Sequence, residues 1–205
     1  MIIVGICGAS GSGKTYLTQK IIKHLAFSQH NILSQDYYYY DQSHIHPKKR
    51  VQTNYDHPDA IDFKLLIDHI HMLKSGNTIQ HPLYDFSEHT RKAKSVATPP
   101  APILMVEGIL IFAVKELKNL FNLKIYVDTP EEICFIRRLE RDVQQRGRTV
   151  ESVIAQYHRT VYPMFLEYVQ PFKNEADLII KKNWTFDYAL KRIMACLNEL
   201  RPRET

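Results

Sequence analysis

Cysteine is scarce in this sequence of 205 residues, and the three present lie far apart. Cys7, Cys134 and Cys196 form no C-x-x-C pair. This spacing argues against a disulfide framework and against a structural zinc site, and it suits a reducing compartment. We therefore expect a cytoplasmic protein without disulfide bonds.

Long apolar runs, repeats and low-complexity segments are also missing. No apolar run approaches the ~20 residues of a membrane span. The first residues, MIIVGICGAS, have no basic region and lead straight into a glycine-rich loop, so we expect no signal peptide and no membrane partner. No linker interrupts the chain, which predicts one domain over residues 1–205.

Acidic residues are slightly outnumbered, 22 against 27 Lys and Arg, which gives a net charge of +5. Such a charge can indicate a nucleic-acid partner. However, the densest basic stretch, RRLERDVQQRGR (137–148), contains acidic residues, and small anionic substrates explain it equally well. In a helix, residues two apart point in different directions, so the pair His69/His71 is a poor metal chelate. We expect no nucleic-acid partner.

Short apolar runs alternate with segments of helical spacing along the chain. Strands are predicted at 2–8, 31–36, 101–106, 123–128 and 176–182. Helices are predicted at 15–27, 56–75, 114–120, 131–145, 148–169 and 186–200. Residues 77–100 change character and predict a small hairpin outside the main sheet. The alternation predicts an α/β fold with a doubly wound parallel sheet of about five strands.

The helix at 131–145 has a periodic apolar pattern as well as several arginines. We expect its apolar side chains to face inward, with the arginines on other sides. The expected inward residues are Ile133, Ile136, Leu139 and Val143.

GASGSGKT (8–15) matches the phosphate-binding P-loop pattern G-x-x-x-x-G-K-[ST] in full, between a predicted strand and a predicted helix. In such loops, backbone N–H groups and the helix N-terminus hold phosphate oxygens. Lys14 is expected to reach the β- and γ-phosphates, and the Thr15 hydroxyl to bind Mg²⁺. The residues predicted to bind the nucleotide are Gly8, Ala9, Ser10, Gly11, Ser12, Gly13, Lys14 and Thr15.

A P-loop alone does not fix the reaction. The chain has no N-K-x-D for reading guanine, which argues against a GTPase, and motor or AAA-type ATPases need more chain than this. A compact P-loop protein of this length is most often a small-molecule kinase. Such kinases use an acid near Mg²⁺, a carboxylate that activates the acceptor, and mobile arginines.

Two acids follow predicted strands at the edge where open α/β sheets bind ligands. We expect Asp36 to accept the proton of the acceptor hydroxyl and Glu107 to hold Mg²⁺, each on a strand that flanks the P-loop strand. Either acid could instead cap a helix.

The arginines of residues 137–148 fall at helical spacings. Arg137 and Arg138 each lie within one turn of Arg141, so the three can share a region of space, and their repulsion makes sense if an anion comes between them. Gly147, between Arg146 and Arg148, supplies a pivot. The alternative is an ordinary solvated helix face. Beside a P-loop, we interpret residues 137–150 as a lid that closes over the transferred phosphoryl group.

Taken in order, these motifs resemble those of the uridine kinases (uridine–cytidine kinases) of the P-loop kinase superfamily. The matching segments cover residues 3 to about 180. They are GASGSGKT, SQDYYY, NYDHPDAID, PLYDFSEHTR, VEGIL, VDTPEE, RRLERDVQQRGR, QYHRTVYPMFLEYVQP and ADLII. NYDHPDAID and YDFSEHTR are more specific than the P-loop.

The resemblance implies phosphorylation of the 5′-hydroxyl of uridine and cytidine with ATP or GTP and Mg²⁺. It implies catalytic roles for Asp36, Lys14 and Arg141, and phosphate contacts from Arg146 and Arg148. Nucleoside binding is implied for Tyr39, Tyr55, Asp56, Tyr84, Phe86, His89, Arg138 and Gln156. Metal binding is implied for Thr15 and Glu107. The resemblance also suggests a homotetramer.

Two departures from the family pattern limit these expectations. Tyr37 follows Asp36 where the family has a small residue, and KKNWTFDYA (181–189) replaces a basic residue with glycines, which leaves the choice of ATP or GTP open. We expect Tyr38 to pack inward and assign no catalytic task to Tyr37 or Tyr40. The alternatives are a phosphoribulokinase-like or pantothenate-kinase-like enzyme, or a non-catalytic nucleotide-binding module.

Overall fold

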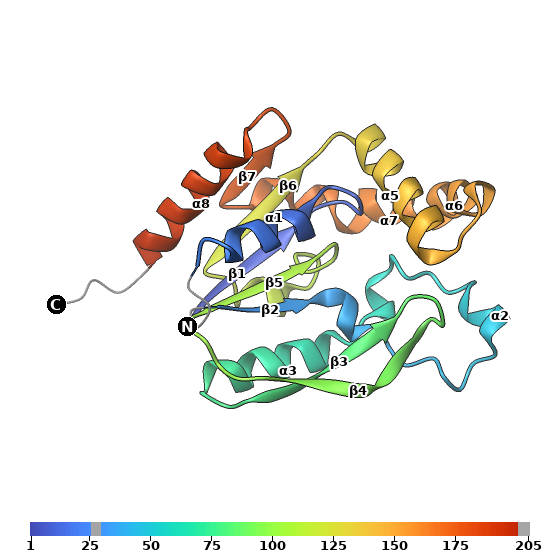
Figure 1. Ribbon diagram of the computed structural model, residues 1–205, viewed down its shortest axis with the longest axis horizontal. Helices are drawn as coiled ribbons and strands as arrows, with labels where there is room; N and C mark the ends of the chain where they lie inside the picture. Colours follow the sequence, from blue (N-terminus) through green and yellow to red (C-terminus); the bar gives the residue numbers. More distant parts are fainter. Residues whose placement is uncertain (26–29, 201–205) are drawn as a thin grey trace.

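The computed structural model describes residues 1–25 and 30–200. Five parallel strands form its central sheet in the order β2-β5-β1-β6-β7 (Figure 1). Their bounds are Ile2–Cys7 (β1), His30–Ser34 (β2), Ile103–Gly108 (β5), Leu123–Asp128 (β6) and Leu178–Lys181 (β7). The predicted five-stranded parallel sheet is confirmed.

Helices cover both faces of this sheet (Figure 1). The helices α1 (Lys14–Ile22) and α8 (Phe186–Leu200) pack on one face. Three others contribute to the core on the opposite face: α3 (Phe63–Lys74), α4 (Lys115–Lys118) and α7 (Tyr162–Tyr168). The first helix, predicted over 15–27, is shorter than expected: α1 ends at Ile22, and the predicted end at Phe27 lies outside the described residues.

The central strand β1 shows why the sheet needs two cores. Successive side chains of a strand point to opposite faces. Val4 and Ile6 pack with α1 and α8, whereas Ile3 and Cys7 pack with the core that contains α3. All four are buried, which is typical of a parallel sheet covered on both sides.

Residues 77–100 form the predicted hairpin. Strands β3 (Ile79–Asp85) and β4 (Thr90–Thr98) pair antiparallel in a separate two-stranded sheet. The hairpin lies along α3 and against the short 3₁₀ helix η2 (Gln35–Tyr38), below the central sheet in Figure 1.

Besides the shorter α1 and α4, which was predicted over 114–120, two predicted helices have different bounds in the structure. The one expected from residue 56 begins at Phe63, because the Asp62 side chain caps it by accepting from the Leu65 N–H, and Pro58–Ala60 forms a separate 3₁₀ turn. The one expected over 148–169 is divided into α6 (Val150–Gln156), a π-helical turn (Tyr157–Val161) and α7. Pro163 near the start of α7 has no N–H to continue an α-helical ladder.

The expected inward face of the helix at 131–145 is wrong for Ile136 and Val143, whereas Ile133 and Leu139 are half-buried. In α5 (Glu131–Arg146) the buried side chains are Cys134, Arg138 and Asp142, whereas Ile136 is 52% exposed and Val143 36%. This helix covers the polar site described below rather than the apolar core, so its buried face carries charge. Among the described residues, no helix combines the length and apolar character needed to cross a membrane.

Candidate active site

The P-loop connects β1 to α1 at the carboxyl end of the sheet. Gly11 and Gly13 adopt left-handed backbone angles, with φ of 85° and 95°. A Cβ on Gly11 would collide with the carbonyl oxygen of Cys134, so the loop closes against α5 only with glycine there. The Thr129 hydroxyl donates to the Ser12 carbonyl at 2.9 Å and braces the loop from the other side.

Thr15 and Glu107 meet below the P-loop. The Thr15 hydroxyl donates to Glu107 Oε2 at 3.2 Å, and the Ser34 hydroxyl donates to Glu107 Oε1 at 2.7 Å. Glu107 is buried, and this burial raises the pKa of its carboxyl group, while the positive charge of Lys14 opposes the shift. The Glu107 carboxylate and the Thr15 hydroxyl supply oxygen atoms of the kind that a hard cation prefers.

Asp36 was predicted to end the second strand, but it lies in the first turn of η2, two residues beyond the end of β2. Strand β2 ends at Ser34, and the Asp36 N–H donates to the Ser34 hydroxyl at 3.3 Å. The expectation that Asp36 and Glu107 end the two strands flanking β1 is wrong for Asp36, because β5 lies between β2 and β1. Alternating strands and helices do not reveal strand order. The two acids are nevertheless linked through Ser34.

Five aromatic rings pack against one another in a cluster, here called the aromatic box: Tyr39, Tyr55, Tyr84, Phe86 and His89. Tyr84 contacts Tyr39 at 4.9 Å and Phe86 at 5.4 Å between ring centroids. Tyr55 stacks on His89 at 5.0 Å and meets Tyr39 edge-on at 5.5 Å. Burial lowers the pKa of His89, and nearby Arg148 and Arg146 act in the same direction. The imidazole is therefore neutral near pH 7, with one donor and one acceptor nitrogen.

Asp56 and Arg138 form a buried pair beside this box. Arg138 Nη1 lies 3.5 Å from Asp56 Oδ1, and Arg138 Nη2 donates to Gln156 Oε1 at 3.2 Å. Arg148 donates to the same Gln156 oxygen. Asp56 Oδ2 is buried and accepts no hydrogen bond from the described residues. It is an acceptor available to a ligand.

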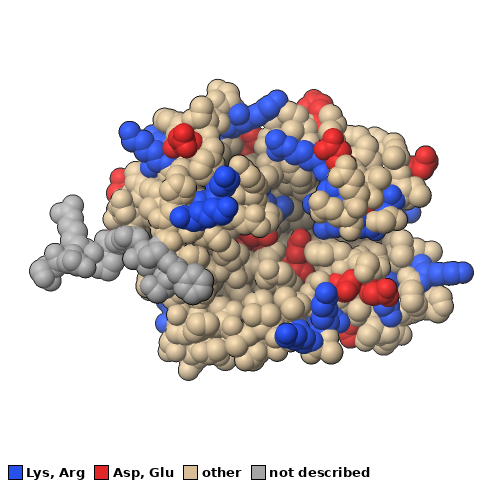
Figure 2. Space-filling model, in the orientation of Figure 1, with Lys and Arg blue, Asp and Glu red and all other residues tan. Residues whose placement is uncertain are grey.

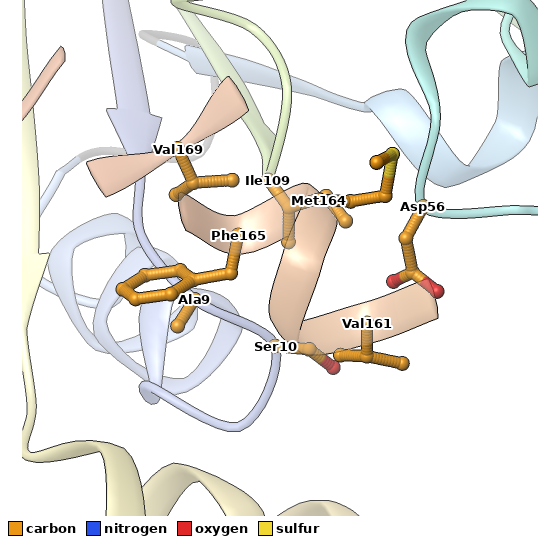
Figure 3. A pocket seen from close by; sticks show the side chains of 8 residues that line it. All are labelled: Ala9, Ser10, Asp56, Ile109, Val161, Met164, Phe165 and Val169. Atoms are coloured by element: carbon orange, nitrogen blue, oxygen red, sulfur yellow. The ribbon is translucent and has the colours of Figure 1, made fainter. Parts of the chain in front are cut away.

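A small pocket borders Asp56 on the side of α7. Figure 3 shows the Asp56 carboxylate beside Met164 and Val161, with Ile109 and Ser10 close by. Its volume is about 10 Å³, which is room for one water at most. A ligand must therefore reach Asp56 from the larger cavity.

The arginines of α5 gather around an acid that the sequence interpretation missed. Asp142 Oδ1 lies 2.9 Å from Arg141 and 3.4 Å from Arg146, and Asp142 Oδ2 lies 3.5 Å from Arg138. The negative charge of Asp142 therefore offsets part of the repulsion among these arginines, a role that the sequence had suggested for an anionic ligand. The i, i+4 spacing of Arg138, Asp142 and Arg146 is the signal that could have found it. Arg137 is exposed and has no such contact with Asp142.

The predicted lid, residues 137–150, also contacts the aromatic box. The Arg146 guanidinium lies over the Phe86 ring, 4.2 Å from its centroid. Burial lowers the pKa of Arg146, and the neighbouring Arg141 adds to this shift while Asp142 opposes it. The segment after α5 turns at Gly147, whose φ of 63° is left-handed.

One cavity of about 440 Å³ brings most of the predicted residues together. Figure 2 shows a hollow across this face of the molecule, with acidic atoms inside it and basic side chains near its rim. The predicted residues that line the cavity are Ser10, Lys14, Thr15, Asp36, Tyr39, Tyr55, Asp56, Tyr84, Phe86, His89, Arg138, Arg141, Arg146, Arg148 and Gln156. Gly8, Ala9, Gly11, Ser12, Gly13 and Glu107 do not line it. Asp142, Ser87 and Ile109 line it without having been predicted.

Curated proteins similar to this chain carry the name uridine kinase. Those of Shewanella sp. strain ANA-3 and Shewanella oneidensis are each 45% identical over 185 residues, covering 88% of this chain and 87% of the relative. That of Shewanella amazonensis is 43% identical over the same share.

Solved structures share the fold at lower identity. A putative fructose transport system kinase from Silicibacter sp. TM1040 aligns with a TM-score of 0.70 at 21% identity, over 90% of this chain and 89% of that one. A possible uridine kinase from Bacillus stearothermophilus aligns with a TM-score of 0.53 at 19% identity, over 87% and 88%. These likenesses support the P-loop kinase fold.

The family match covers most of the chain. Residues 3–189 match the Phosphoribulokinase / Uridine kinase family. Together with the relatives at 43–45% identity, this match confirms the resemblance predicted from the motifs. The chain belongs to the Phosphoribulokinase / Uridine kinase family.

Proposed function

We propose that this protein is a uridine kinase that transfers the γ-phosphoryl group of ATP or GTP to the 5′-hydroxyl of uridine and cytidine. The observation that carries the proposal is the single cavity that joins Lys14 and Asp36 to the aromatic box and Asp56. A phosphoryl donor and a nucleoside can meet in it. The curated relatives named uridine kinase, at 45% identity, support the same choice of acceptor.

The far part of the cavity suits a ribonucleoside. The open Asp56 Oδ2 accepts a hydrogen bond from a ribose hydroxyl, and Arg138 is a fixed donor beside it. A site that hydrogen-bonds a required hydroxyl rejects analogues lacking it by up to ~10⁴-fold. The base packs against the aromatic side chains of Tyr39, Tyr55, Tyr84 and Phe86. The neutral His89 forms hydrogen bonds with the polar edge of the base.

Phosphoryl transfer takes place between the two parts. Asp36 accepts the proton of the 5′-hydroxyl while the oxygen of that hydroxyl attacks the γ-phosphorus of the donor. The bond between the γ-phosphorus and the bridging oxygen to the β-phosphate breaks, and the nucleoside diphosphate leaves. Lys14 and the arginines Arg141, Arg146 and Arg148 neutralise the charge on the phosphate oxygens. Positioning and electrostatics supply most of the rate enhancement in this chemistry.

The donor set at Thr15 and Glu107 fits Mg²⁺. This ion is usually held by one or two carboxylates together with substrate phosphates and water. The Thr15 hydroxyl and Glu107 Oε2 are 3.2 Å apart, so both can face one ion, and Ser34 orients the carboxylate. When bound, Mg²⁺ neutralises charge on the donor phosphates.

Further features stay predictions. They are the relative use of cytidine, the choice between ATP and GTP, assembly as a homotetramer, and a cytoplasmic location. The segment KKNWTFDYA (181–189) departs from the basic residue and glycines of the family pattern, so the proposal leaves the choice of purine donor open.

A substrate panel tests the proposal. Purified protein is incubated with Mg²⁺, ATP or GTP, and one acceptor: uridine, cytidine, ribulose 5-phosphate or pantothenate. We expect UMP and CMP as products. Turnover of ribulose 5-phosphate or pantothenate without turnover of either nucleoside would overturn the proposal, and nucleotide binding without any turnover would indicate a non-catalytic module.

A further inference from the structure

Asp142 is almost fully buried inside the arginine cluster of α5, where no role has been assigned to it. Its exposed fraction is 1%. Its Oδ1 lies within 3.4 Å of both Arg141 and Arg146, and its Oδ2 lies 3.5 Å from Arg138. Three guanidinium groups from one helix thus share a single carboxylate.

The charges of this cluster do not cancel. Three arginines face Asp142, and Arg138 also faces Asp56, so three positive and two negative charges leave an excess of one positive charge, which favours binding of the anionic donor. Arginine side chains have many rotamers, and a fixed partner reduces the orientations that they sample. Asp142 therefore provides orientation while the excess charge still provides attraction.

Asp142 also connects the lid to the nucleoside side of the cavity. Arg138 faces Asp142 through Nε and Asp56 through Nη1. Arg146 contacts Asp142 and also lies over the Phe86 ring. Contacts therefore run without interruption from the predicted ribose acceptor to the predicted phosphate-binding arginines.

We propose that Asp142 is a positioning residue that orients Arg141 and Arg146 toward the transferred phosphoryl group and fixes them relative to Arg138. The inference rests on the proposed function, because it needs a phosphoryl donor in the cavity. A purely structural ion cluster would stabilise the fold without separate effects on turnover and donor binding.

Asp142→Asn distinguishes the two roles, with Glu140→Gln as its control. Glu140 is an exposed acid on the same helix, so both variants raise the net charge by one. For Asp142→Asn we expect kcat to fall about 10- to 100-fold, because small misplacements of catalytic groups have effects of this size. The donor KM should stay the same or fall, because the cluster gains positive charge. Glu140→Gln should change neither value more than about twofold.

A cycle with Arg141→Gln tests whether Asp142 acts through that arginine. Adding Asp142→Asn to Arg141→Gln should lower kcat much less than it does in the parent enzyme. If Asp142→Asn does not fold, Asp142→Glu keeps the charge but moves it by one methylene, and should lower kcat without raising the donor KM.

Three results would overturn the inference. The first is a kcat of Asp142→Asn within twofold of the parent. The second is a lower melting temperature of Asp142→Asn together with a donor KM that rises by the same factor as kcat falls. The third is that the effects of Asp142→Asn and Arg141→Gln on kcat are additive. The parent protein is assayed with uridine in parallel. Failure of the parent to phosphorylate uridine would reject the proposed function itself, whereas normal parent turnover with an unaffected variant would reject only the role of Asp142.

Discussion

At the scale of single residues, one serine connects the two acids proposed for chemistry. Ser34 donates through its hydroxyl to Glu107 and accepts at the same oxygen from the Asp36 N–H. Asp36 is half-buried and lines the cavity, whereas Glu107 is buried below the P-loop. The two carboxylates therefore have different surroundings, which suits one for a proton and the other for a cation.

Asp36→Asn tests the proton acceptor. The amide keeps the size of the side chain but cannot take the 5′-hydroxyl proton, so kcat with uridine should fall roughly 10²- to 10⁴-fold. The melting temperature should change little, because Asp36 makes no ion pair with the described residues. Steady-state kinetics and thermal unfolding measure both.

The matched control for Asp36→Asn is Asp68→Asn. Asp68 is exposed on α3, where it pairs with Lys64 one turn away, and the substitution changes the net charge by the same amount. Its kcat should match that of the parent. Near-normal turnover by Asp36→Asn would mean that another group accepts the proton.

At this scale, the residues that could be predicted from the sequence are those in motifs with fixed spacing. In SQDYYYY, Tyr38 is buried as predicted and its hydroxyl bonds to His69, while Tyr39 lines the cavity. Tyr37 had no assigned task and stacks on His81 at 5.0 Å. Such a contact joins residues far apart in the chain, so no local pattern could reveal it.

At the scale of elements, the site depends on a helix whose buried face is charged. The apolar periodicity of α5 predicted an inward Ile136, but this helix covers a polar cavity, where the buried Arg138 and Asp142 form an ion pair at 3.5 Å. Hydrophobic periodicity identifies the face toward an apolar core and fails where the neighbour is an active site. The hairpin at 77–100 was predictable because its alternation and turn residues are local.

Gly147→Ala tests whether the turn at the end of α5 is the pivot of the lid. A left-handed backbone costs an alanine roughly 1–2 kcal/mol, and no atom within 4 Å would obstruct its Cβ. The melting temperature should fall modestly. If the lid turns at this residue, kcat should fall as well, by about tenfold.

Gly76→Ala is the control, because Gly76 also has a positive φ, of 86°, and open space around its Cβ, but follows α3 away from the lid. It should lower stability to a similar extent and leave kcat unchanged. Equal kinetic effects of the two substitutions would show that strain, and not lid movement, limits turnover.

At the scale of the whole molecule, the fold brings distant segments to the carboxyl edge of one sheet. The P-loop, η2, the hairpin and the lid all contribute to the cavity although they span residues 10 to 156. The alternation of strands and helices predicted the sheet, but the order β2-β5-β1 depends on which strands pair in space. The sequence alone predicted that the strand before Asp36 lies next to β1, whereas β5 lies between β2 and β1.

Acidification should destabilise the folded protein through two histidines, the buried His69 and the half-buried His89. Burial lowers the pKa of His69 and of His89 below the usual 6.5. Between those pKa values and 6.5 the unfolded chain binds more protons, so the free energy of unfolding rises with pH and falls as pH drops below about 6.5. Urea unfolding at pH 7.5 and 5.5 measures this difference.

His69→Gln removes one of these groups and should make the difference in unfolding free energy between pH 7.5 and 5.5 smaller. The exposed His44→Gln serves as the control and should leave that difference as in the parent. An equal difference in the parent and in His69→Gln would show that His69 does not contribute.

The most direct test of the central claim is the identity of the product from uridine, Mg²⁺ and ATP, determined by ³¹P and ¹H nuclear magnetic resonance. We expect uridine 5′-monophosphate, no phosphorylated product from 5′-deoxyuridine, and much slower turnover of 2′-deoxyuridine, because Asp56 and Arg138 are proposed to bind the ribose hydroxyls. Phosphate on another hydroxyl, or no phosphorylation of uridine at all, would contradict that claim.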